Sequence, residues 1–467
     1  MNTFTKYWKF NIQETDYFNS ISKHSNNIVN EKINLIQSVH DLKMAHNFKK
    51  IISDNPNEYF QCIVPNITYY SFLYWVTIIP KILKDFHHYM IRKEWRKLYN
   101  KFGINIYYNS KNIRFLKKIS NFILAFKFFT KLSSREELLN HNFNSIKCGD
   151  LIYDSYLRFN KKATLNINDY TLILFLHDCY NQIDYYQDLV KTKTIINYYT
   201  TYSTYISHGI PVRVFLDKGV NVYVIGYSTF KKLKIKKLSI KDNTQVSPHW
   251  LYRNKFKDLE NKNNLINLGY KKIKNRLNGS ETLDYMDTNQ YDFNNKIAFN
   301  SKFEGVVFIG DFTDAQHIYR SLVYHDLYLW LIDTIRITKK YKLNVGFKPH
   351  PNNKPESKLL IKVLKKKYPD INWIDPKVSN KDIFDSGIKF GVSAYGTVLS
   401  ELAFNKILAI CCGDNPCSDF DFILEAKNKN EYEELIKNAN KIKFNNNYHQ
   451  QLGEFIYMDK IFYSKMR

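Results

Sequence analysis

The stretch GVVFIGDFTDAQH, residues 305–317, decides the fold. Its first six residues form an apolar, β-branched run between two glycines, which predicts a short strand. The polar residues after it predict a loop, and a helical pattern then continues through Lys340. A short apolar strand, a polar loop and a long helix make one βα unit, from which parallel sheets are built.

The same alternation continues through the C-terminal half and predicts βαβ units around a parallel sheet. Its further predicted strands are LNVGFKPH (343–350), INWID (371–375), IKFGVS (388–393) and KILAICCG (406–413). The N-terminal half alternates less clearly. Its strand candidates are YFQCIVPN (59–66), FGINIYYN (102–109), TLILFLHD (171–178), TIINYYTTYS (194–203) and VNVYVIG (220–226).

We therefore predict an α/β protein with two Rossmann-like lobes and a ligand cleft between the carboxyl ends of their strands. The chain of 467 residues is long enough for two or three complete cores. The predicted parts are an N-terminal, acceptor-side lobe (1–230), a basic connecting segment (231–300), a C-terminal lobe that binds a nucleotide (301–435) and a tail that packs back on the N-terminal lobe (436–467).

The charge balance is strongly basic, with 69 Lys and Arg against 44 Asp and Glu and a net charge of +25. Such a charge favours polyanions: nucleic acid, phosphorylated substrates or an anionic membrane face. We find no zinc-finger spacing, no aromatic motif for base stacking and no basic region joined to heptads, so nucleic acid is not expected. An anionic donor or a membrane surface is the preferred partner.

Two apolar segments bear on membrane contact. Residues 67–83 are apolar and aromatic but slightly short for a membrane span and contain Pro80, so we expect a buried first helix of the N-terminal lobe. Residues 116–132, LKKISNFILAFKFFTKL, set lysines among aromatic side chains. That pattern fits an interfacial helix, and equally a core helix whose lysines reach the surface.

The cysteines and the N-terminus indicate the compartment. Six scattered cysteines without C-x-x-C spacing predict neither a disulfide framework nor a zinc site. The opening MNTFTKYWKFNIQETDYF contains no apolar run of a secretory signal. We therefore expect reduced thiols in a cytoplasmic protein.

A histidine between two prolines ends the predicted strand 343–350. Pro349 and Pro351 restrict the backbone on both sides of His350. An imidazole at the carboxyl end of a strand can donate to a phosphate oxygen, and Lys348 adds a positive charge. A histidine that merely ends the strand and bonds to a backbone carbonyl is the alternative, and this stretch alone leaves both open.

The stretch GVSAYGTVLSE, 391–401, favours the phosphate reading. A strand is predicted to end at Ser393 and a helix to begin near Gly396, where helix-terminal N–H groups can bind an anion. The hydroxyls of Ser393 and Thr397 add donors, and Glu401, one turn further, can accept from the hydroxyls of a ribose. The alternative is that both hydroxyls cap the helix and that Glu401 is a solvated residue.

The stretches FKPHP and VSAYGTVLSELA together resemble the GT-B glycosyltransferases that build bacterial capsule and surface polysaccharides. FIGDFTDAQHIYRSLVYHDLYLWLIDTI (308–335) looks like the opening of their donor lobe. CGDLIYDSYLRF (148–159) and YISHGIPVRVFLDKGVNVYVIG (205–226) are similar to acceptor-lobe segments. The resemblance covers roughly residues 147–435. It departs where such proteins often have Gly-x-Pro, because this chain has Asn405, Lys406 and Ile407.

The resemblance implies a nucleotide-activated donor bound by the C-terminal lobe, a sugar acceptor at the N-terminal lobe, and no cofactor or obligatory divalent metal. The acceptor is expected to be an oligosaccharide, a polysaccharide or a lipid-linked glycan at the inner face of the cytoplasmic membrane. The residues then expected to bind the nucleotide sugar are Lys348, His350, Pro351, Ser393, Tyr395, Gly396, Thr397 and Glu401.

Sugar transfer with inversion needs a base that takes the proton of the acceptor hydroxyl. Asp150 and Asp154 lie one helical turn apart if residues 148–159 are helical, and Asp314 lies in the loop after the strand 305–310. An ordinary salt bridge from Asp154 to Arg158 is the alternative for that helix. Residues that could line the acceptor side or the cleft are Arg158, His208, Arg213 and His317.

The residues Asp419 and Asp421 spell D-x-D, the metal signature of a different glycosyltransferase fold, but so short a match is frequent by chance and no metal site is expected. The sequence thus predicts a glycosyltransferase of capsule or surface-glycan assembly. The alternatives are a nucleotide-sugar 2-epimerase, a polyol-phosphate transferase of the CDP-glycerol type with the same fold, and a non-catalytic scaffold at the membrane.

Overall fold

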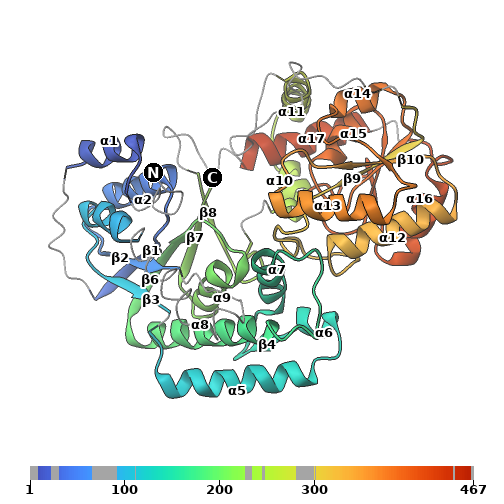
Figure 1. The fold of residues 1–467 in the computed structure, drawn as a ribbon. Helices are drawn as coiled ribbons and strands as arrows, with labels where there is room; N and C mark the ends of the chain where they lie inside the picture. Colours follow the sequence, from blue (N-terminus) through green and yellow to red (C-terminus); the bar gives the residue numbers. More distant parts are fainter. Residues whose placement is uncertain are drawn as a thin grey trace. The chain divides into compact units, whose positions relative to one another are not determined.

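The structure is a computed structural model that describes residues 9–22, 31–65, 92–110, 112–226, 234–244, 248–279, 299, 301–444 and 448–463. The chain forms two compact units, the first from residues 1–160 and 166–245 and the second from residues 161–165 and 246–466. Each unit contains one six-stranded sheet with helices packed around it (Figure 1).

The first sheet has the strand order β3-β2-β1-β6-β7-β8. Its strands are β1 (Lys32–Gln37), β2 (Phe60–Val64), β3 (Tyr107–Asn109), β6 (Thr194–Thr200), β7 (Asn221–Gly226) and β8 (Lys234–Lys237). All neighbours pair in parallel except β7 and β8, which are antiparallel. This is the Rossmann order, in which the two halves of the sheet meet between β1 and β6.

The second sheet repeats that topology with the order β11-β10-β9-β12-β13-β14, and every pair is parallel. Its strands are β9 (Gly305–Ile309), β10 (Val345–Pro349), β11 (Asn372–Trp373), β12 (Phe390–Val392), β13 (Leu408–Cys411) and β14 (Ile423–Glu425). Here the two halves of the sheet meet between β9 and β12.

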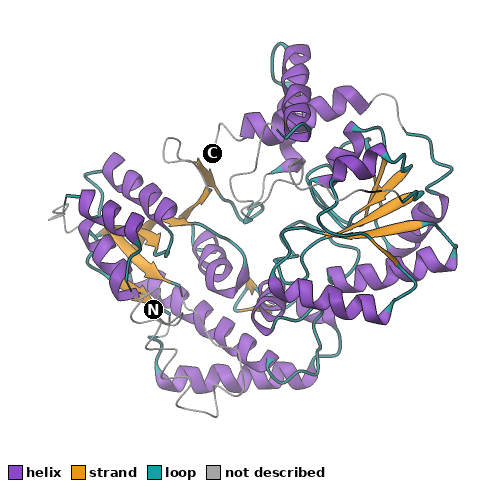
Figure 2. Ribbon diagram, turned by 45° about the horizontal axis from the view of Figure 1, so that its top comes forward, coloured by secondary structure: helices purple, strands orange, loops and turns teal. Residues whose placement is uncertain are grey.

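Helices cover both sheets (Figure 2). The first unit has α1 (Ile12–Ser20), α2 (Leu42–Asp54), α5 (Phe115–Lys131), α6 (Arg135–Leu139), the hairpin β4 (Asn142–Phe143) and β5 (Ile146–Lys147), α7 (Gly149–Asn160), α8 (Leu172–Thr192), the π-helix Tyr205–Gly209 and α9 (Ile210–Asp217). The second has the 3₁₀ turn His249–Leu251, α10 (Tyr252–Lys257), α11 (Lys262–Leu277), α12 (Leu327–Lys340), α13 (Pro355–Lys367), α14 (Asn380–Asp385), α15 (Val398–Phe404), α16 (Lys429–Asn438), α17 (Tyr448–Ile456) and the π-helix Tyr457–Phe462.

The alternation of side chains along β9 explains why its sequence is uninterruptedly apolar. Val306 and Phe308 pack into one hydrophobic cluster, and Val307 and Ile309 pack into another. Successive side chains of a strand point to opposite faces, so β9 contributes to a separate core on each face of the sheet. The fold class predicted from the sequence, α/β with two Rossmann-like lobes, is confirmed.

In the first unit one strand prediction is wrong and one strand was missed. Residues 171–178 do not form a strand, because their apolar run continues with helical spacing into the long helix α8, whose side chains are buried on most sides. The central strand β1 was missed because Asn34 and Gln37 interrupt its apolar pattern. Both elements are buried on nearly all sides, so the spacing of their apolar residues does not identify their structure.

The segment boundaries also differ from those predicted. The stretch 231–300 contributes β8 to the first sheet and α10 and α11 to the second unit. The tail lies in the second unit, where α17 crosses α11 closely enough that a Cβ on Gly269 would lie 2.0 Å from the carbonyl oxygen of Gly453. Two glycines on facing helices permit that crossing, and the apolar side chains of α17 complete a core there.

Other expectations concern the membrane and the thiols. The segment 67–83, predicted as a buried helix, lies outside the described residues. Among the residues that are described, no helix is both long and apolar enough to cross a membrane. All six cysteines are buried and unpaired, as expected of reduced thiols.

Candidate functional site

The second sheet has its topological switch point between β9 and β12, and open α/β sheets bind ligands outside the carboxyl ends of the strands there. The segments that leave the sheet at or next to this switch point include the loop after β9, the His-Pro turn after β10 and the loop 393–397 after β12. Most residues predicted to bind a nucleotide sugar lie on the last two segments.

His350 is held by the backbone on both sides of its ring. Its N–H donates to the carbonyl of Ile309, 3.0 Å away, and its Nδ1 accepts from the N–H of Asn352 at 3.1 Å. Because Nδ1 accepts, the proton of the neutral ring is on Nε2. Burial, and next the charge of Lys348, lower the pKa of His350. The turn therefore holds a neutral imidazole whose proton is on Nε2.

Asp311 connects the loop after β9 to the His-Pro turn. Its carboxylate accepts from the N–H of Lys354 at 2.7 Å, from the hydroxyl of Ser357 at 2.8 Å and from the N–H of Thr313 at 2.9 Å. Burial alone would raise the pKa of Asp311, but these hydrogen bonds together lower it below its usual value. Asp311 was not among the predicted residues, although a carboxylate directly after a buried strand is a signal that the sequence contains.

Lys348 and Glu401 are buried beneath this edge and do not face solvent. The Nζ of Lys348 donates to Asn380 Oδ1 at 2.7 Å, and Asn380 Nδ2 donates to Glu401 Oε2 at 3.2 Å. Burial lowers the pKa of Lys348 to about 8. The two charged residues predicted to contact phosphate and ribose thus belong to a buried chain of hydrogen bonds that joins β10, α14 and α15.

Arg276 of α11 is the partly exposed end of that chain. Its guanidinium donates to Glu401 Oε1 at 3.0 Å and to the hydroxyl of Thr397 at 3.4 Å. The side chain of Arg276 remains 17% exposed, compared with 1% for Glu401. The sequence analysis missed Arg276, because it lies in the segment taken as a connection and reaches Thr397 only through the packing of α11.

The loop 393–397 is open at its glycine. Gly396 has φ +136°, and a Cβ there would meet nothing within 4 Å, so a ligand can approach the backbone closely. The hydroxyl of Ser393 donates to the carbonyl of Tyr395 at 2.9 Å and therefore shapes the loop. The helix α15 that follows has only seven residues, and the side chain of its N-cap, Thr397, forms no capping bond. The ring of Tyr395 lies edge-on to that of Tyr319.

Asp414, in the loop after β13, is a second heavily bonded carboxylate at this edge. It accepts from His249 Nε2 at 2.8 Å, and from the backbone N–H and the Nε of Arg320 at 2.9 and 3.1 Å. Burial would raise the pKa of Asp414, but its bonds to His249 and Arg320 hold it well below the usual range. This cluster was also missed, since His249 lies in the segment taken as a connection.

The other predicted residues of the second unit have structural partners. Asp314 and His317 lie in the loop after β9, as expected; Asp314 pairs with Lys354 Nζ at 3.0 Å and His317 Nε2 donates to the carbonyl of His325. Asp421 of the D-x-D stretch accepts from Gln451 of α17 at 2.8 Å. Within the described part of the chain, no three His, Cys, Asp or Glu side chains are grouped closely enough to hold a metal ion.

In the first unit the structure brings Asp150 and Arg213 together. The two form a bidentate ion pair with both N–O distances at 2.6 Å, and Arg213 also donates to the carbonyl of Lys147. Asp154, one turn further along α7, is buried, while Arg158 lies in the last turn of that helix. Asp150 and Arg213 therefore stabilise the packing of α7 against α9.

His208 lies at the corresponding switch point of the first sheet. Its Nδ1 accepts from Gln37 Nε2 at 2.7 Å, and Gln37 Oε1 accepts from the hydroxyl of Thr200 at 2.8 Å. Gln37 ends β1 and Thr200 ends β6, the two strands that flank the switch point. Burial lowers the pKa of His208 to about 4, so this ring is neutral as well. Gln37 and Thr200 were not predicted.

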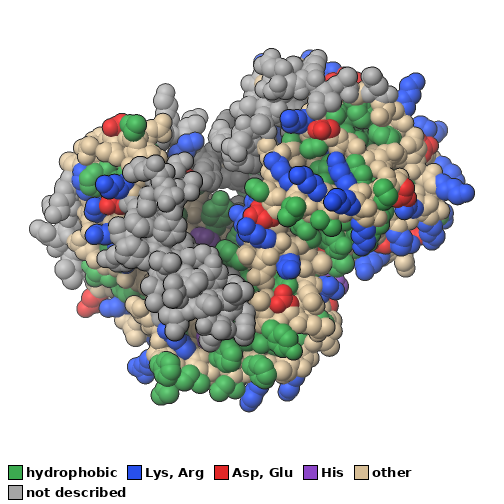
Figure 3. Space-filling model, viewed as in Figure 1, with side chains coloured by type: hydrophobic (Ala, Val, Ile, Leu, Met, Phe, Trp, Pro, Cys, Tyr) green, Lys and Arg blue, Asp and Glu red, His purple; other side chains and the backbone are tan. Residues whose placement is uncertain are grey.

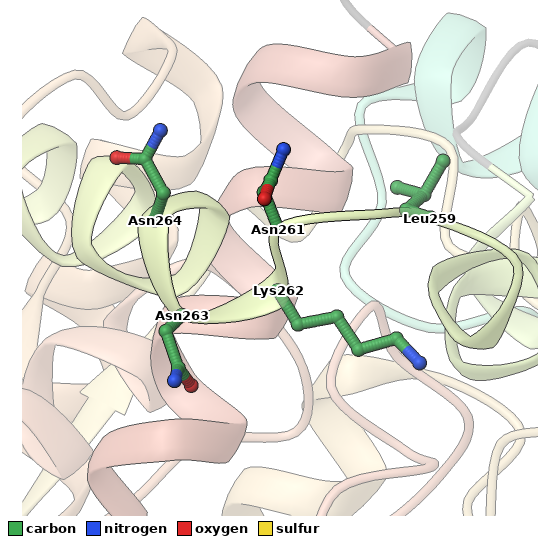
Figure 4. A pocket seen from close by; sticks show the side chains of 5 residues that line it. All are labelled: Leu259, Asn261, Lys262, Asn263 and Asn264. Atoms are coloured by element: carbon green, nitrogen blue, oxygen red, sulfur yellow. The ribbon is translucent and has the colours of Figure 1, made fainter.

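A separate hollow of about 530 Å³ lies at the start of α11 (Figure 4). It is lined by Leu259, Asn261, Lys262, Asn263 and Asn264. None of these residues belongs to the switch-point segments, and the lining contains neither a carboxylate nor a histidine. We assign this hollow no role.

Comparison with known proteins yields distant structural likeness. No family model matches the chain, and no curated protein matches it in sequence. A UDP-GlcNAc 2-epimerase from Methanocaldococcus jannaschii, solved with UDP-GlcNAc and UDP, is 11% identical with a TM-score of 0.30, over 90% of this chain and 97% of that one. Its counterpart from Neisseria meningitidis, bound to UDP-GlcNAc, is 8% identical with a TM-score of 0.26, over 93% and 96%.

The Anabaena protein HepE, in complex with UDP and glucose, is 8% identical with a TM-score of 0.28, over 91% of this chain and 94% of that one. Because these TM-scores are low, the topology of the chain itself defines its class. The chain consists of two Rossmann-like units, and each unit has a histidine at the carboxyl edge of its sheet.

Proposed function

We propose that this protein is a glycosyltransferase of the GT-B fold that transfers a sugar from a nucleotide-activated donor to an oligosaccharide, polysaccharide or lipid-linked acceptor. The observation that carries the proposal is the set of donors at the switch point of the second sheet: His350 Nε2, Arg276 and the open loop at Gly396. The strands β10, β9 and β12 are neighbours, so the His-Pro turn and this loop are roughly 10 Å apart. A nucleoside phosphate joined to a sugar can span that distance.

The proposed chemistry stabilises the leaving nucleotide. The bond from the anomeric carbon to the phosphate oxygen breaks, and the nucleotide departs with the electron pair. His350 and Arg276 donate hydrogen bonds to the phosphate, on which negative charge grows in the transition state. The acceptor oxygen forms the new bond to the anomeric carbon, and its proton passes to a base.

Among the three carboxylates considered as the base, Asp314 fits best. Its side chain is 62% exposed and lies in the loop after β9, at the switch point. Asp150 is occupied by both nitrogens of Arg213, and Asp154 is buried within α7. A base must reach the proton that it removes, and among the three Asp314 meets that condition.

The setting is proposed from the resemblance of FKPHP and VSAYGTVLSELA to enzymes of capsule and surface-glycan assembly. We accordingly propose a cytoplasmic enzyme that works at the inner face of the membrane without a cofactor or an obligatory divalent metal. Transfer measured with and without EDTA tests the last point, and loss of transfer on chelation would refute it.

The deciding experiment is a binding screen followed by an assay. CMP-, UDP-, GDP- and CDP-linked compounds are tested for thermal stabilisation, and the stabilising compound is then incubated with and without acceptor glycans. Glycosyl transfer requires both nucleotide binding and a product that appears only with acceptor. An epimeric nucleotide sugar formed without acceptor would instead identify a 2-epimerase, and a product that carries a phosphate would identify a polyol-phosphate transferase. If no nucleotide stabilises the protein, the proposal is wrong and a scaffold role is favoured.

A further inference from the structure

The helix α5 packs on α8 largely through polar contacts and leaves a row of large apolar side chains exposed. Buried Asn121 donates to Asn181 Oδ1 at 3.0 Å and to Asp184 Oδ2 at 2.7 Å, and Lys117 pairs with Asp184 at 3.1 Å. Only Asn121 and Ala125 of this 17-residue helix are buried. Phe122 and Phe128 add ring contacts with His177 and His141, so the polar network and two aromatic contacts attach α5, and most of its other large apolar side chains remain exposed.

The outward face of α5 carries large apolar side chains. The exposed ones, with their exposed fractions, are Phe115 (74%), Leu116 (79%), Ile119 (43%), Ile123 (48%), Leu124 (42%) and Phe126 (47%). Most recur at the spacing of three and four residues that places side chains on one side of a helix. Tyr170, 72% exposed and in ring contact with Phe129, extends the same surface. We call this set of seven side chains the α5 face.

Lysines accompany the α5 face. The helix contains Lys117, Lys118, Lys127 and Lys131 and no acidic residue. Lys127 and Lys131 are exposed and lie one helical turn apart, directly after the apolar row. Figure 3 shows hydrophobic side chains gathered along the lower edge of the molecule, where α5 lies, with basic side chains beside them. An apolar row next to lysines is typical of helices that lie in the interface of an anionic bilayer.

We propose that the α5 face binds the surface of an anionic phospholipid membrane, with its apolar side chains between the acyl chains and Lys127 and Lys131 at the lipid phosphates. Charge selects this occupant over a second copy of the chain. A two-fold contact would bring the same face of two copies together and thus set lysines against lysines, whereas lipid phosphates neutralise them. The inference does not depend on the catalytic proposal.

Co-sedimentation with vesicles tests the inference on the full chain. Binding to vesicles of phosphatidylcholine with 30% phosphatidylglycerol, a composition typical of such assays, should exceed binding to pure phosphatidylcholine and should weaken as salt rises. Equal binding to both vesicles, or none to either, would overturn the proposal.

The apolar contribution is tested by the variant L116Q/I119Q/I123Q/F126Q, which replaces exposed side chains by residues that favour helix. Partitioning should weaken at least about 100-fold, because each large apolar side chain withdrawn from water contributes roughly tenfold. The matched control is L359Q/V363Q, which removes apolar side chains that are 63% and 55% exposed on α13. Thermal unfolding verifies that both variants fold. Binding of the α5 variant at the level of the wild type would refute the inference.

The electrostatic contribution is tested by K127E/K131E against K362E/K366E on α13, which changes net charge equally at the same spacing. The α5 variant should lose about 30-fold in affinity, roughly fivefold for each lysine removed from the surface, while the control should lose much less. If both pairs lose affinity equally, the attraction is general and the lysines of α5 have no special part.

A probe placed on the helix reports its position directly. All six native cysteines are buried, so Ile123→Cys can be labelled selectively with an environment-sensitive fluorophore, with Val363→Cys as the control. Anionic vesicles should shift the emission to the blue at position 123 and leave it unchanged at 363. A blue shift at 123 without vesicles that grows with protein concentration, together with a dimer in sedimentation velocity, would assign the α5 face to a second copy and overturn the lipid proposal.

Discussion

The two Rossmann units share one strand order but differ in what they place at the switch point. In the first unit the residues there are neutral: Gln37, Thr200 and a neutral His208. In the second unit the corresponding edge carries charge, from Asp311 and Asp414 to Arg320 and Arg276. A charged edge with fixed hydrogen-bond donors suits an anionic nucleotide, and a neutral hydroxyl-rich edge suits a polyhydroxyl acceptor. The shared topology thus gives each unit a candidate site, and under the function proposed above the side chains suit the two sites to different ligands.

The histidines show the same contrast. His350 is fixed by the backbone of its own turn, whereas His208 is fixed by Gln37, which is far away in the sequence. In both rings Nδ1 accepts a hydrogen bond and Nε2 carries the proton. Each imidazole therefore acts as a neutral donor, and the difference lies in how it is held.

The largest expected effect, on stability, comes from removing Asp414, the carboxylate that binds His249 and Arg320 in the second unit. Asp414→Ala leaves buried His249 and the bonded side of Arg320 without their anion, which should destabilise the second unit by about 3–5 kcal/mol. Peptide-resolved hydrogen exchange should show the loss in the second unit. Asp421→Ala, which removes only the exposed contact with Gln451, is the control and should change stability by less than about 1 kcal/mol. Equal losses in the two units would remove the contrast between them.

The next effect separates the two histidines by function. Replacing His350 by Ala should weaken nucleotide binding roughly 10- to 150-fold, the value of a hydrogen bond to a charged group. Replacing His208 by Ala should leave the Kd for the nucleotide within about twofold and raise the KM for the acceptor. Calorimetry with the nucleotide and steady-state kinetics with the acceptor measure the two. A clearly higher Kd for the nucleotide in the His208 variant would show that both histidines serve one nucleotide site.

Acid should affect the first unit through His208. The pKa of His208 is about 4 in the folded protein, below its unfolded value, so the unfolded state binds more protons between pH 6.5 and 4. Stability from the neutral ring is therefore present above pH 6.5 and is lost as pH falls, by about 2 kcal/mol after allowance for the partial exposure of the ring. Exchange protection of the first unit at pH 7 and pH 4.5 measures this loss. Burial also lowers the pKa of His141 and of His177 in the same unit, so His208→Gln should remove only part of the dependence. An unchanged slope in that variant would show that the ring of His208 is not responsible.

Alkali should affect the second unit through Lys348. Its folded pKa of about 8 lies below the unfolded value of Lys, so between these values the folded state binds fewer protons and stability rises with pH. The rise should be on the order of 1–2 kcal/mol between pH 8 and 9.5. Denaturant melts at these two pH values, with Lys348→Met for comparison, test the sign. Burial raises the pKa of the thiols of Cys411, Cys412 and Cys417 in the same unit, and these thiols oppose the rise, so the measured quantity is the difference between wild type and variant. A wild type whose stability does not rise relative to that of Lys348→Met would contradict the assignment.

The smallest effect concerns the neutral network of the first unit. Thr200→Val keeps the shape of the side chain but removes one hydroxyl from Gln37 Oε1, which still accepts from Thr201. The free energy of unfolding should fall by about 1 kcal/mol, the net value of one neutral hydrogen bond. A loss as large as that of Asp414→Ala would mean that the network of the first unit is as critical as the charged centre of the second.

Prediction from sequence succeeded where local pattern and final structure agree. The strands β9, β10, β12 and β13 were recognised because each is a short apolar run at a regular interval from a helix. Residues 171–178 were assigned to a strand because a short apolar run looks the same in a strand and in a buried helix. In the candidate site, the turn at His350 could be predicted because Pro349 and Pro351 restrict the backbone of their immediate neighbours.

The sequence by itself determined the class of fold, the His350 turn and the open glycine at position 396, because strand periodicity, proline geometry and positive φ are properties of neighbouring residues. Only the tertiary structure decided that Lys348 and Glu401 are buried and joined through Asn380, and that Arg276, Asp414 and His249 lie at the candidate site. It also decided that Gln37 orients His208 and that α5 exposes a row of apolar residues. Each of these depends on contacts between residues far apart in the chain. Burial and charge pairing are set by such contacts, and no local pattern encodes them.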